Sequence, residues 1–256
     1  IPSLEDTKFD VEVDGEAKTF SVGQLDKFTR RIFNRGSFEC GGRFWGGWWQ
    51  RCKKDLRPHI FINNHPTIEV DFSGFHIIML YAEEKINYWK HFGTDPYELP
   101  DLGIFENSNQ QRSTTKLLFL MLLNAKSEGE AYNAFRQNSE NGTPEKRLTN
   151  DQLSKIKAAL EEKHPHIRKH FCADVGVRLM NKDAQITEVI IETFCNHNIP
   201  VLSVHDSYIV PEGYVDELIS TMCIAFEKVM GIPLTGLEQY AMKENKVRLE
   251  YLFDAL

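Results

Sequence analysis

Residues 201–210 read Val-Leu-Ser-Val-His-Asp-Ser-Tyr-Ile-Val. The two apolar runs predict short strands joined by a tight turn at His205 and Asp206. A further strand is predicted for residues 67–72, which read Thr-Ile-Glu-Val-Asp-Phe. Asp71 therefore stands near the end of one predicted strand, and Asp206 stands in the turn between the two others. Asp71 and Asp206 are candidate Mg²⁺ ligands, because this ion prefers oxygen donors and is usually held by one or two carboxylates. Either aspartate taken alone is more often a turn or cap residue.

The rest of the chain is rich in helical patterns. A hairpin is predicted over residues 11–20 around Asp14-Gly15, because each side alternates between apolar and polar residues. Capping signals and apolar spacing predict helices over residues 21–34, 75–84, 112–136, 149–163, 183–197 and 213–230, with a linker at 138–148. A few antiparallel strands among many helices are typical of the α+β class.

The bulk composition is that of an ordinary globular protein. The chain has 256 residues, of which 41% are hydrophobic and 26% are charged, and its formal net charge is −7. This length favours one domain and leaves room for a subdomain. The five cysteines form no Cys-x-x-Cys pair, which argues against a disulfide framework or a zinc knuckle. We expect a reducing, cytoplasmic setting, and no apolar run is long enough to span a bilayer.

Positive charge is concentrated near the N-terminus despite the acidic total. Residues 27–57 contain nine Lys/Arg residues and two acidic residues. The same segment holds Phe44, Trp45, Trp48 and Trp49. Cations bind phosphates and flat rings stack on bases, so the segment is a candidate nucleic-acid surface. The alternative is a solvated basic face above core tryptophans.

A second basic pair begins the long apolar helix pattern between the two aspartates. Arg112 and Lys116 are four residues apart, which places them on one helix face, where both can reach a triphosphate. The alternative is a solvated helix face.

Histidine suggests two further kinds of site. His205 beside Asp206 could be the base of a hydrolase, but no Gly-x-Ser-x-Gly elbow accompanies it. The cluster of His164, His166 and His170 lacks cysteine partners, so we expect it to have a capping or surface role rather than to bind metal.

Taken in order, four segments resemble the palm and fingers of family A DNA polymerases and phage-type single-subunit RNA polymerases. Gly42-Arg43 with Gln50 downstream resembles the Gly-Arg element. Asp71-Phe-Ser-Gly, Arg112-x3-Lys116 and His205-Asp206-Ser207 resemble motifs A, B and C. The helix over residues 179–194 resembles the one that precedes motif C. The resemblance covers roughly residues 35–212.

The resemblance implies a right-hand polymerase fold within the α+β class. We expect a palm over residues 35–256 with a small antiparallel sheet, a helical fingers insertion at about 105–150, and little or no thumb. Residues 1–34 would be a reduced thumb-like or accessory hairpin and helix. The implied ligands are two Mg²⁺ ions, for which Mn²⁺ can substitute, primer–template nucleic acid and nucleoside triphosphates. A helicase, primase or processivity partner, a role in replication or repair, and a bacterial or phage-infected cytosol are also implied.

The resemblance also assigns expected roles to individual residues. Asp71, Asp206 and the Phe72 backbone carbonyl would bind the metals, and Arg112 and Lys116 the triphosphate, with Lys116 assisting the leaving group. Phe72, His76 and Asn124 would belong to the nucleotide pocket. The expected nucleic-acid contacts are Arg43, Gln50, Arg51, Lys53, Lys54 and His205.

Three positions depart from the patterns of the family. His76 stands where the DNA enzymes place a Glu and the RNA enzymes a Gly, and its ring favours dNTPs. Ser207 is similar to the RNA branch, so the sugar preference stays open. Asn124-Ala125 replaces an aromatic residue and Gly. The alternatives are a template-independent transferase, a primer-synthesising enzyme and a catalytically weak nucleic-acid-binding module on a palm fold.

Overall fold

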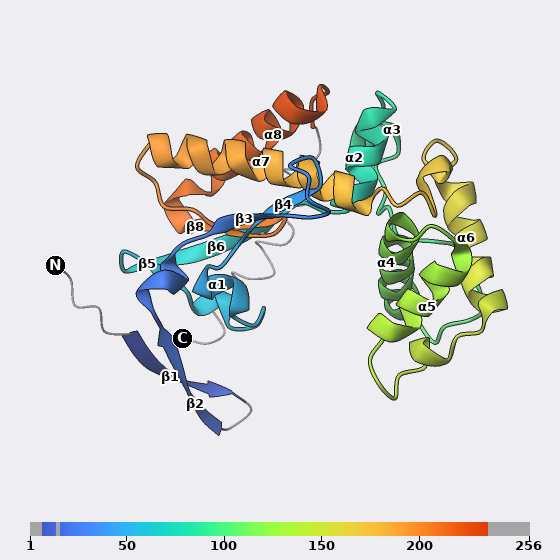
Figure 1. Cartoon of the computed structure of the whole chain (residues 1–256), viewed down its shortest axis with the longest axis horizontal. Coiled ribbons are helices and arrows are strands. Elements are labelled where there is room, and N and C mark those ends of the chain that lie inside the picture. Colours follow the sequence, from blue (N-terminus) through green and yellow to red (C-terminus); the bar gives the residue numbers. More distant parts are fainter. Residues whose placement is uncertain (1–6, 14–15, 235–256) are drawn as a thin grey trace.

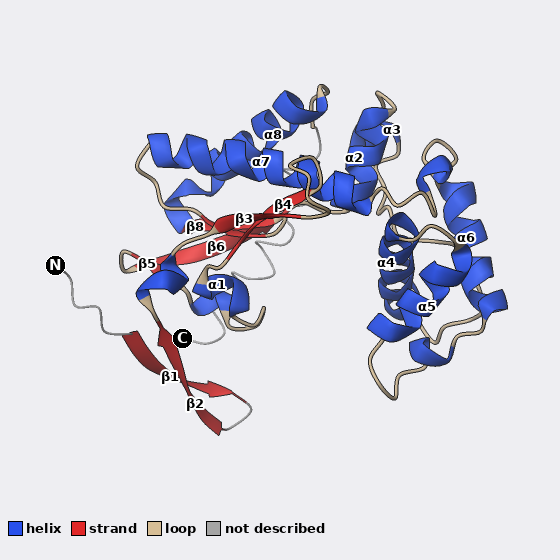
Figure 2. Cartoon of the chain, viewed as in Figure 1, coloured by secondary structure: helices blue, strands red, loops and turns tan. Residues whose placement is uncertain are grey.

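The computed structural model describes residues 7–13 and 16–234. Two regions lie side by side in Figure 1: a sheet region that carries most of the strands, and a helical region formed by α4, α5 and α6. Figure 2 shows the helical region as helices joined by loops. The architecture is α+β with small antiparallel sheets, as predicted.

The main sheet has the strand order β5-β6-β8-β7 and is antiparallel throughout. Its strands are β5 (Phe61–Ile62), β6 (His65–Asp71), β7 (Leu202–Val204) and β8 (Ser207–Pro211). The predicted strands at 67–72 and 201–210 are therefore confirmed. They pair through β6 and β8, with Thr67 opposite Pro211 and Asp71 opposite Ser207. This register brings the two aspartate-bearing segments together.

Helices cover the sheet on both sides (Figure 1). α7 (Gly176–Asn196) packs against α8 (Val215–Met230), and α8 contacts β6 and β8. The short helix α1 (Trp48–Arg51) contacts β7, where the Trp49 indole Nε1 donates to the Ser203 carbonyl at 2.9 Å. No helix among the described residues is long and apolar enough to cross a bilayer.

The helical region contains two helices where the sequence predicted one over 112–136. α4 (Ser108–Asn124) ends before α5 (Glu128–Asn138) begins. The break occurs because Ser127 caps α5, accepting a hydrogen bond from the backbone N–H of Glu130. α6 (Asn150–Lys163) begins at the predicted capping box formed by Thr149 and Gln152. Two shorter helices, α2 (Phe75–Glu83) and α3 (Tyr88–His91), follow β6.

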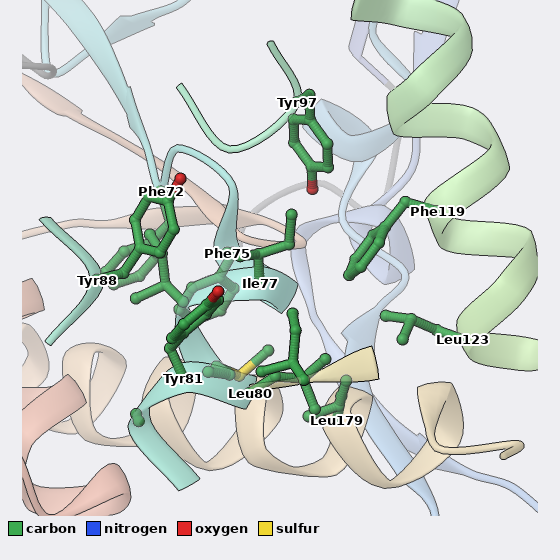
Figure 3. Close-up of a cluster of buried hydrophobic side chains, with 14 of the residues drawn as sticks. Phe72, Phe75, Ile77, Leu80, Tyr81, Tyr88, Tyr97, Phe119, Leu123 and Leu179 are labelled. Atoms are coloured by element: carbon green, nitrogen blue, oxygen red, sulfur yellow. The ribbon is translucent and has the colours of Figure 1, made fainter. Parts of the chain in front are cut away.

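One apolar core joins the two regions (Figure 3). Phe72 and Phe75 stack at 4.2 Å below the end of β6, and Tyr97 meets Phe119 of α4 at 5.9 Å. Phe72, Phe75, Tyr97 and Phe119 are each at most 2% exposed. Shared burial of this kind holds α4 at a fixed position beside the sheet.

The N-terminal part confirms one prediction and corrects another. β1 (Thr7–Val13) and β2 (Glu16–Val22) form the predicted hairpin, whose turn residues Asp14 and Gly15 lie outside the described residues. The helix predicted over 21–34 is wrong. Only a 3-10 turn, Gln24–Lys27, forms there, and β3 (Arg30–Phe33) follows it. Pairing of β3 with β4 (Gly41–Trp45) satisfies the backbone and overrides the local helix signal.

Candidate metal and nucleotide site

The two predicted metal ligands meet at the end of the main sheet. Asp71 is the last residue of β6, and Asp206 lies in the turn between β7 and β8. The backbone N–H of Phe72 donates to the Asp206 carbonyl at 3.3 Å, and Asp71 pairs with Ser207. Segments distant in the sequence therefore place their carboxylates at one edge.

The turn that carries Asp206 has an uncommon backbone. Val204 pairs with Ser207, so His205 and Asp206 form a two-residue hairpin loop. His205 has a φ of 57°, as the first loop residue of the favoured hairpin turns does. Its ring packs edge-on against Trp45 of β4 at 4.6 Å, and burial lowers the pKa of the imidazole. The packing fixes a turn conformation that few residues other than Gly adopt readily.

A hollow of about 180 Å³ opens between the strand ends and the basic segment. Its lining combines acidic, basic and polar side chains: Lys54, Arg57, Glu69, Asp71, Val204, His205, Asp206 and Ser207. Asp71 and Asp206 thus face one space that an ion and a phosphate can enter. Lys54 is exposed, so its ammonium is accessible at the edge of this space.

His76 lies in the first turn of α2, within electrostatic reach of Asp206 and of two cations. Burial, with the nearby cations Arg43 and Lys116, lowers the pKa of His76 to about 4, and the Asp206 carboxylate opposes this shift. These effects require Arg43, Lys116 and Asp206 to lie near the ring. His76 is therefore neutral at physiological pH and has charges of both signs in its surroundings.

Arg43 is held from behind by a buried carboxylate. Its Nε donates to Asp183 Oδ2 at 2.5 Å, and the Asp183 side chain, on α7, is fully buried. Burial raises the pKa of Asp183 to about 6, against the attraction of Arg43. The Arg43 side chain is 18% exposed, so most of it is enclosed by the protein.

Arg112 and Lys116 share one face of α4, as predicted. The Arg112 guanidinium and the Lys116 Nζ each lie 5.9 Å from the centre of the Tyr97 ring. Arg112 also donates to Asp95 Oδ2 through Nε at 2.8 Å and Nη2 at 2.6 Å. Burial raises the pKa of Tyr97, and the carboxylates of Asp206, Asp95 and Asp71 raise it further. Tyr97 therefore lies beside the cations of α4 and within electrostatic reach of both aspartates.

The donor set fits a hard divalent cation. Asp71 and Asp206 supply carboxylate oxygens, and Mg²⁺ characteristically completes its shell with water and substrate phosphates. Across residues 7–13 and 16–234, no three His, Cys, Asp or Glu side chains form a ready-made metal-binding group. A site in which substrate completes the shell around two carboxylates agrees with the presence of Asp71 and Asp206 and with the lack of a three-residue group in the described part of the chain.

Several predicted contacts have other partners. The Gln50 amide donates to the carbonyls of Phe44 and Ser203 and accepts from Gly46, so it braces the backbone rather than facing a nucleic acid. The Phe72 side chain is buried, which leaves only its backbone for a ligand. Arg51 forms an ion pair with Asp26 at 2.7 Å, although its side chain is 65% exposed. Lys53 is also exposed.

Asn124 lies apart from the other candidates. It ends α4, about 18 Å along the helix axis from Arg112 at a rise of 1.5 Å per residue. Its Nδ2 donates to the Leu120 carbonyl at 2.8 Å. A Cβ added at Gly176 would lie 2.1 Å from Asn124 Oδ1, so the amide packs against the first residue of α7. The geometry assigns Asn124 to the junction of α4 with α7.

His164, the first residue of the histidine cluster, has a structural role. His164 is the C-cap residue of α6 and is fully buried, with its Nδ1 3.1 Å from the Tyr81 hydroxyl and its Nε2 2.8 Å from the Pro96 carbonyl. Its capping role was predicted, and its burial was not. Burial lowers its pKa to about 4.

Five residues near the site were not singled out from the sequence: Arg57, Glu69, Asp95, Tyr97 and Asp183. Only Glu69 had a usable signal, because it stands two residues before Asp71 and so shares its strand face. The others reach the site from other elements. The functional case depends on the residues described above, because the chain matches no family model and no curated protein.

Proposed function

We propose that the chain is a metal-dependent nucleotidyltransferase, a minimal family A-like nucleic acid polymerase. One observation carries the proposal: Asp71 and Asp206, on segments joined by β6–β8 pairing, line a single hollow. Two carboxylates that share a space repel each other unless cations offset their charge. In the proposal, the sheet region is the palm, α4 to α6 belong to the fingers, and residues 1–34 are accessory.

The proposed chemistry is phosphoryl transfer onto a 3′ end. Asp71, Asp206 and the Phe72 carbonyl would hold two Mg²⁺ ions, which supply charge neutralisation at the attacking and leaving oxygens. Arg112 and Lys116 would bind the β- and γ-phosphates, because both cations lie on one face of α4 beside Tyr97. Lys116 is exposed and not buried under other side chains, so it can follow the departing pyrophosphate.

Primer and template would lie along the basic segment next to the hollow. Lys53 and Lys54 are exposed there, and Trp45 is 40% exposed beside the Asp206 turn. Exposed cations fit the phosphate backbone, and an exposed indole can stack on a base. Arg43 of β4 would contact the primer and template from the sheet.

His76 is proposed to face the sugar of the incoming nucleotide. It lies within electrostatic reach of Asp206, a proposed metal ligand, and of Lys116, a proposed phosphate ligand. A neutral, bulky ring at this place would exclude a ribose 2′-OH and favour dNTPs. Replacement by Gly would remove the obstacle.

Primer extension tests the proposal. Wild-type protein is incubated with Mg²⁺ or Mn²⁺, a primed template and either dNTPs or rNTPs, beside the variant His76→Gly. Template-directed extension is expected, and the variant should accept rNTPs far better than wild type. Extension of a single strand independent of template sequence would favour the tailing or primer-synthesising alternative. Nucleic-acid binding without incorporation under either metal would favour the binding module.

A further inference from the structure

Glu69 is a third carboxylate in the hollow, and both of its oxygens are occupied. It is 6% exposed and lies on the same face of β6 as Asp71. Arg57 Nε donates to Glu69 Oε2 at 2.9 Å, and Ser207 Oγ donates to Glu69 Oε1 at 2.6 Å. A buried carboxylate is tolerated when it is paired and hydrogen-bonded in this way.

The bond to Ser207 connects β6 with the turn that carries Asp206. Ser207 directly follows Asp206, and its hydroxyl has one proton to donate. Glu69 Oε1 is closer to that hydroxyl than the Val204 carbonyl is, at 2.6 Å against 3.1 Å. The turn is therefore fixed by a charge-assisted side-chain bond in addition to the strand ladder.

Arg57 determines where the Glu69 carboxylate lies. Its side chain is 13% exposed and comes from the 3-10 turn Arg57–His59, outside the strands. With Oε2 held by Arg57, Oε1 is directed at Ser207. Arg57 also lines the hollow, so the pair lies beside the space that the aspartates face.

We infer that Glu69, held by Arg57, is a positioning residue that fixes the Asp206 turn through Ser207 and thereby sets the affinity of the site for a divalent cation. The inference rests on the proposed function. It concerns cation binding to the protein alone, so it can be tested without nucleotide or nucleic acid. A side chain that only stabilised the core would lower stability and leave the cation affinity of folded protein unchanged.

The test is a Mn²⁺ titration of metal-free protein, with free Mn²⁺ measured by electron paramagnetic resonance. The variants are Glu69→Gln, Glu69→Ala, Ser207→Ala, the double variant Glu69→Ala/Ser207→Ala, and Asp206→Asn. Loss of a residue that orients a metal ligand typically weakens metal binding by about 10- to 100-fold. We expect such a loss for Glu69→Ala, smaller losses for Glu69→Gln and Ser207→Ala, and a double variant no weaker than Glu69→Ala, because both changes remove one link.

Thr67→Ala is the matched control. Thr67 lies on the same face of β6, is also buried, and donates through Oγ1 to the Ile60 carbonyl at 2.6 Å. It does not line the hollow. Its replacement removes a buried hydrogen bond from the same strand and should leave the Mn²⁺ dissociation constant unchanged. Circular dichroism at each titration condition shows which variants are folded.

Unchanged Mn²⁺ affinity in folded Glu69→Gln and Ser207→Ala, with affinity lost in Asp206→Asn, would overturn the inference and leave the proposed function standing. Equal weakening in Thr67→Ala would also overturn it, because the effect would then be general to β6. If Glu69→Ala does not fold, Glu69→Gln and Ser207→Ala decide the outcome. Wild-type protein that binds no Mn²⁺ would contradict the proposed metal site and the inference together.

Discussion

Arg112 donates two hydrogen bonds to one oxygen of Asp95, through Nε at 2.8 Å and Nη2 at 2.6 Å. Arg112 is one of the two cations proposed to bind the triphosphate, so the carboxylate and the phosphates compete for it. The Arg112 side chain is 42% exposed, and ion pairs at such sites contribute only about 0–1 kcal/mol. The competition is therefore weak enough for a triphosphate to overcome.

Replacing Asp95 should strengthen nucleotide binding. Asp95→Asn removes the competing charge, and we expect the dissociation constant for a nucleoside triphosphate to fall by about two- to fivefold, the equivalent of roughly 0.4–1 kcal/mol. Equilibrium binding of a fluorescent triphosphate measures it. Asp101→Asn is the control, because Asp101 is exposed in the same connection and accepts from the Gly103 N–H. Weaker binding by Asp95→Asn would show that Asp95 positions Arg112 for the nucleotide.

Lys116 should matter for the rate of transfer more than for stability. Lys116→Ala removes an exposed cation from α4, so the free energy of unfolding should change by less than about 0.5 kcal/mol. Removal of a group that stabilises developing charge typically lowers kcat by about 100-fold or more. Single-nucleotide incorporation under single-turnover conditions gives the rate. Lys126→Ala, which removes a 73% exposed lysine just beyond α4, should have the wild-type rate.

The sequence predicted the elements that carry chemistry better than it predicted their surroundings. The apolar runs in residues 67–72 and 201–210 correctly predicted the strands that carry Asp71 and flank the turn with Asp206, and four-residue spacing placed Arg112 with Lys116. These are local patterns, which a sequence displays directly.

Contacts between distant segments account for what the sequence did not show. Asp95 and Tyr97 come from an irregular connection that meets α4 only in the folded chain. Asp183 looks like any polar residue on an amphipathic helix until Arg43 is found against it. Residues 30–33 form a strand because β4 offers a partner. Gln50 was predicted to contact a nucleic acid, and its amide donates hydrogen bonds to the carbonyls of Phe44 and Ser203.

His76 should make the folded protein sensitive to acid. Burial, Arg43 and Lys116 lower its pKa to about 4, below the ordinary value of 6.5. Between these pH values the unfolded chain binds more protons than the folded chain, so stability is lost as the pH falls from 6.5 towards 4. Urea unfolding across this range should show a smaller loss for His76→Gln than for wild type. Identical pH slopes would mean that His76 is not buried near those cations.

Asp183 should have the opposite effect on how stability changes with pH. Burial raises its pKa to about 6, above the ordinary value of 3.8. Between these values the folded chain binds more protons, so this group lowers stability as the pH rises from 3.8 to 6. Relative to wild type, Asp183→Asn should therefore gain stability over that range. A difference between the two proteins that stays constant with pH would show that the Asp183 carboxylate titrates normally.

The most direct measurement is the rate of single-nucleotide incorporation by Asp71→Asn and Asp206→Asn, each compared with wild type and with Asp216→Asn. Asp216 lies in the first turn of α8, away from the residues that line the hollow. Each of the two active-site changes should lower the rate by about 1,000-fold or more, because the group it removes holds the charge-neutralising ion. The Asp216 variant should retain the wild-type rate. Incorporation that persists at the wild-type rate in either Asp71→Asn or Asp206→Asn would contradict the account.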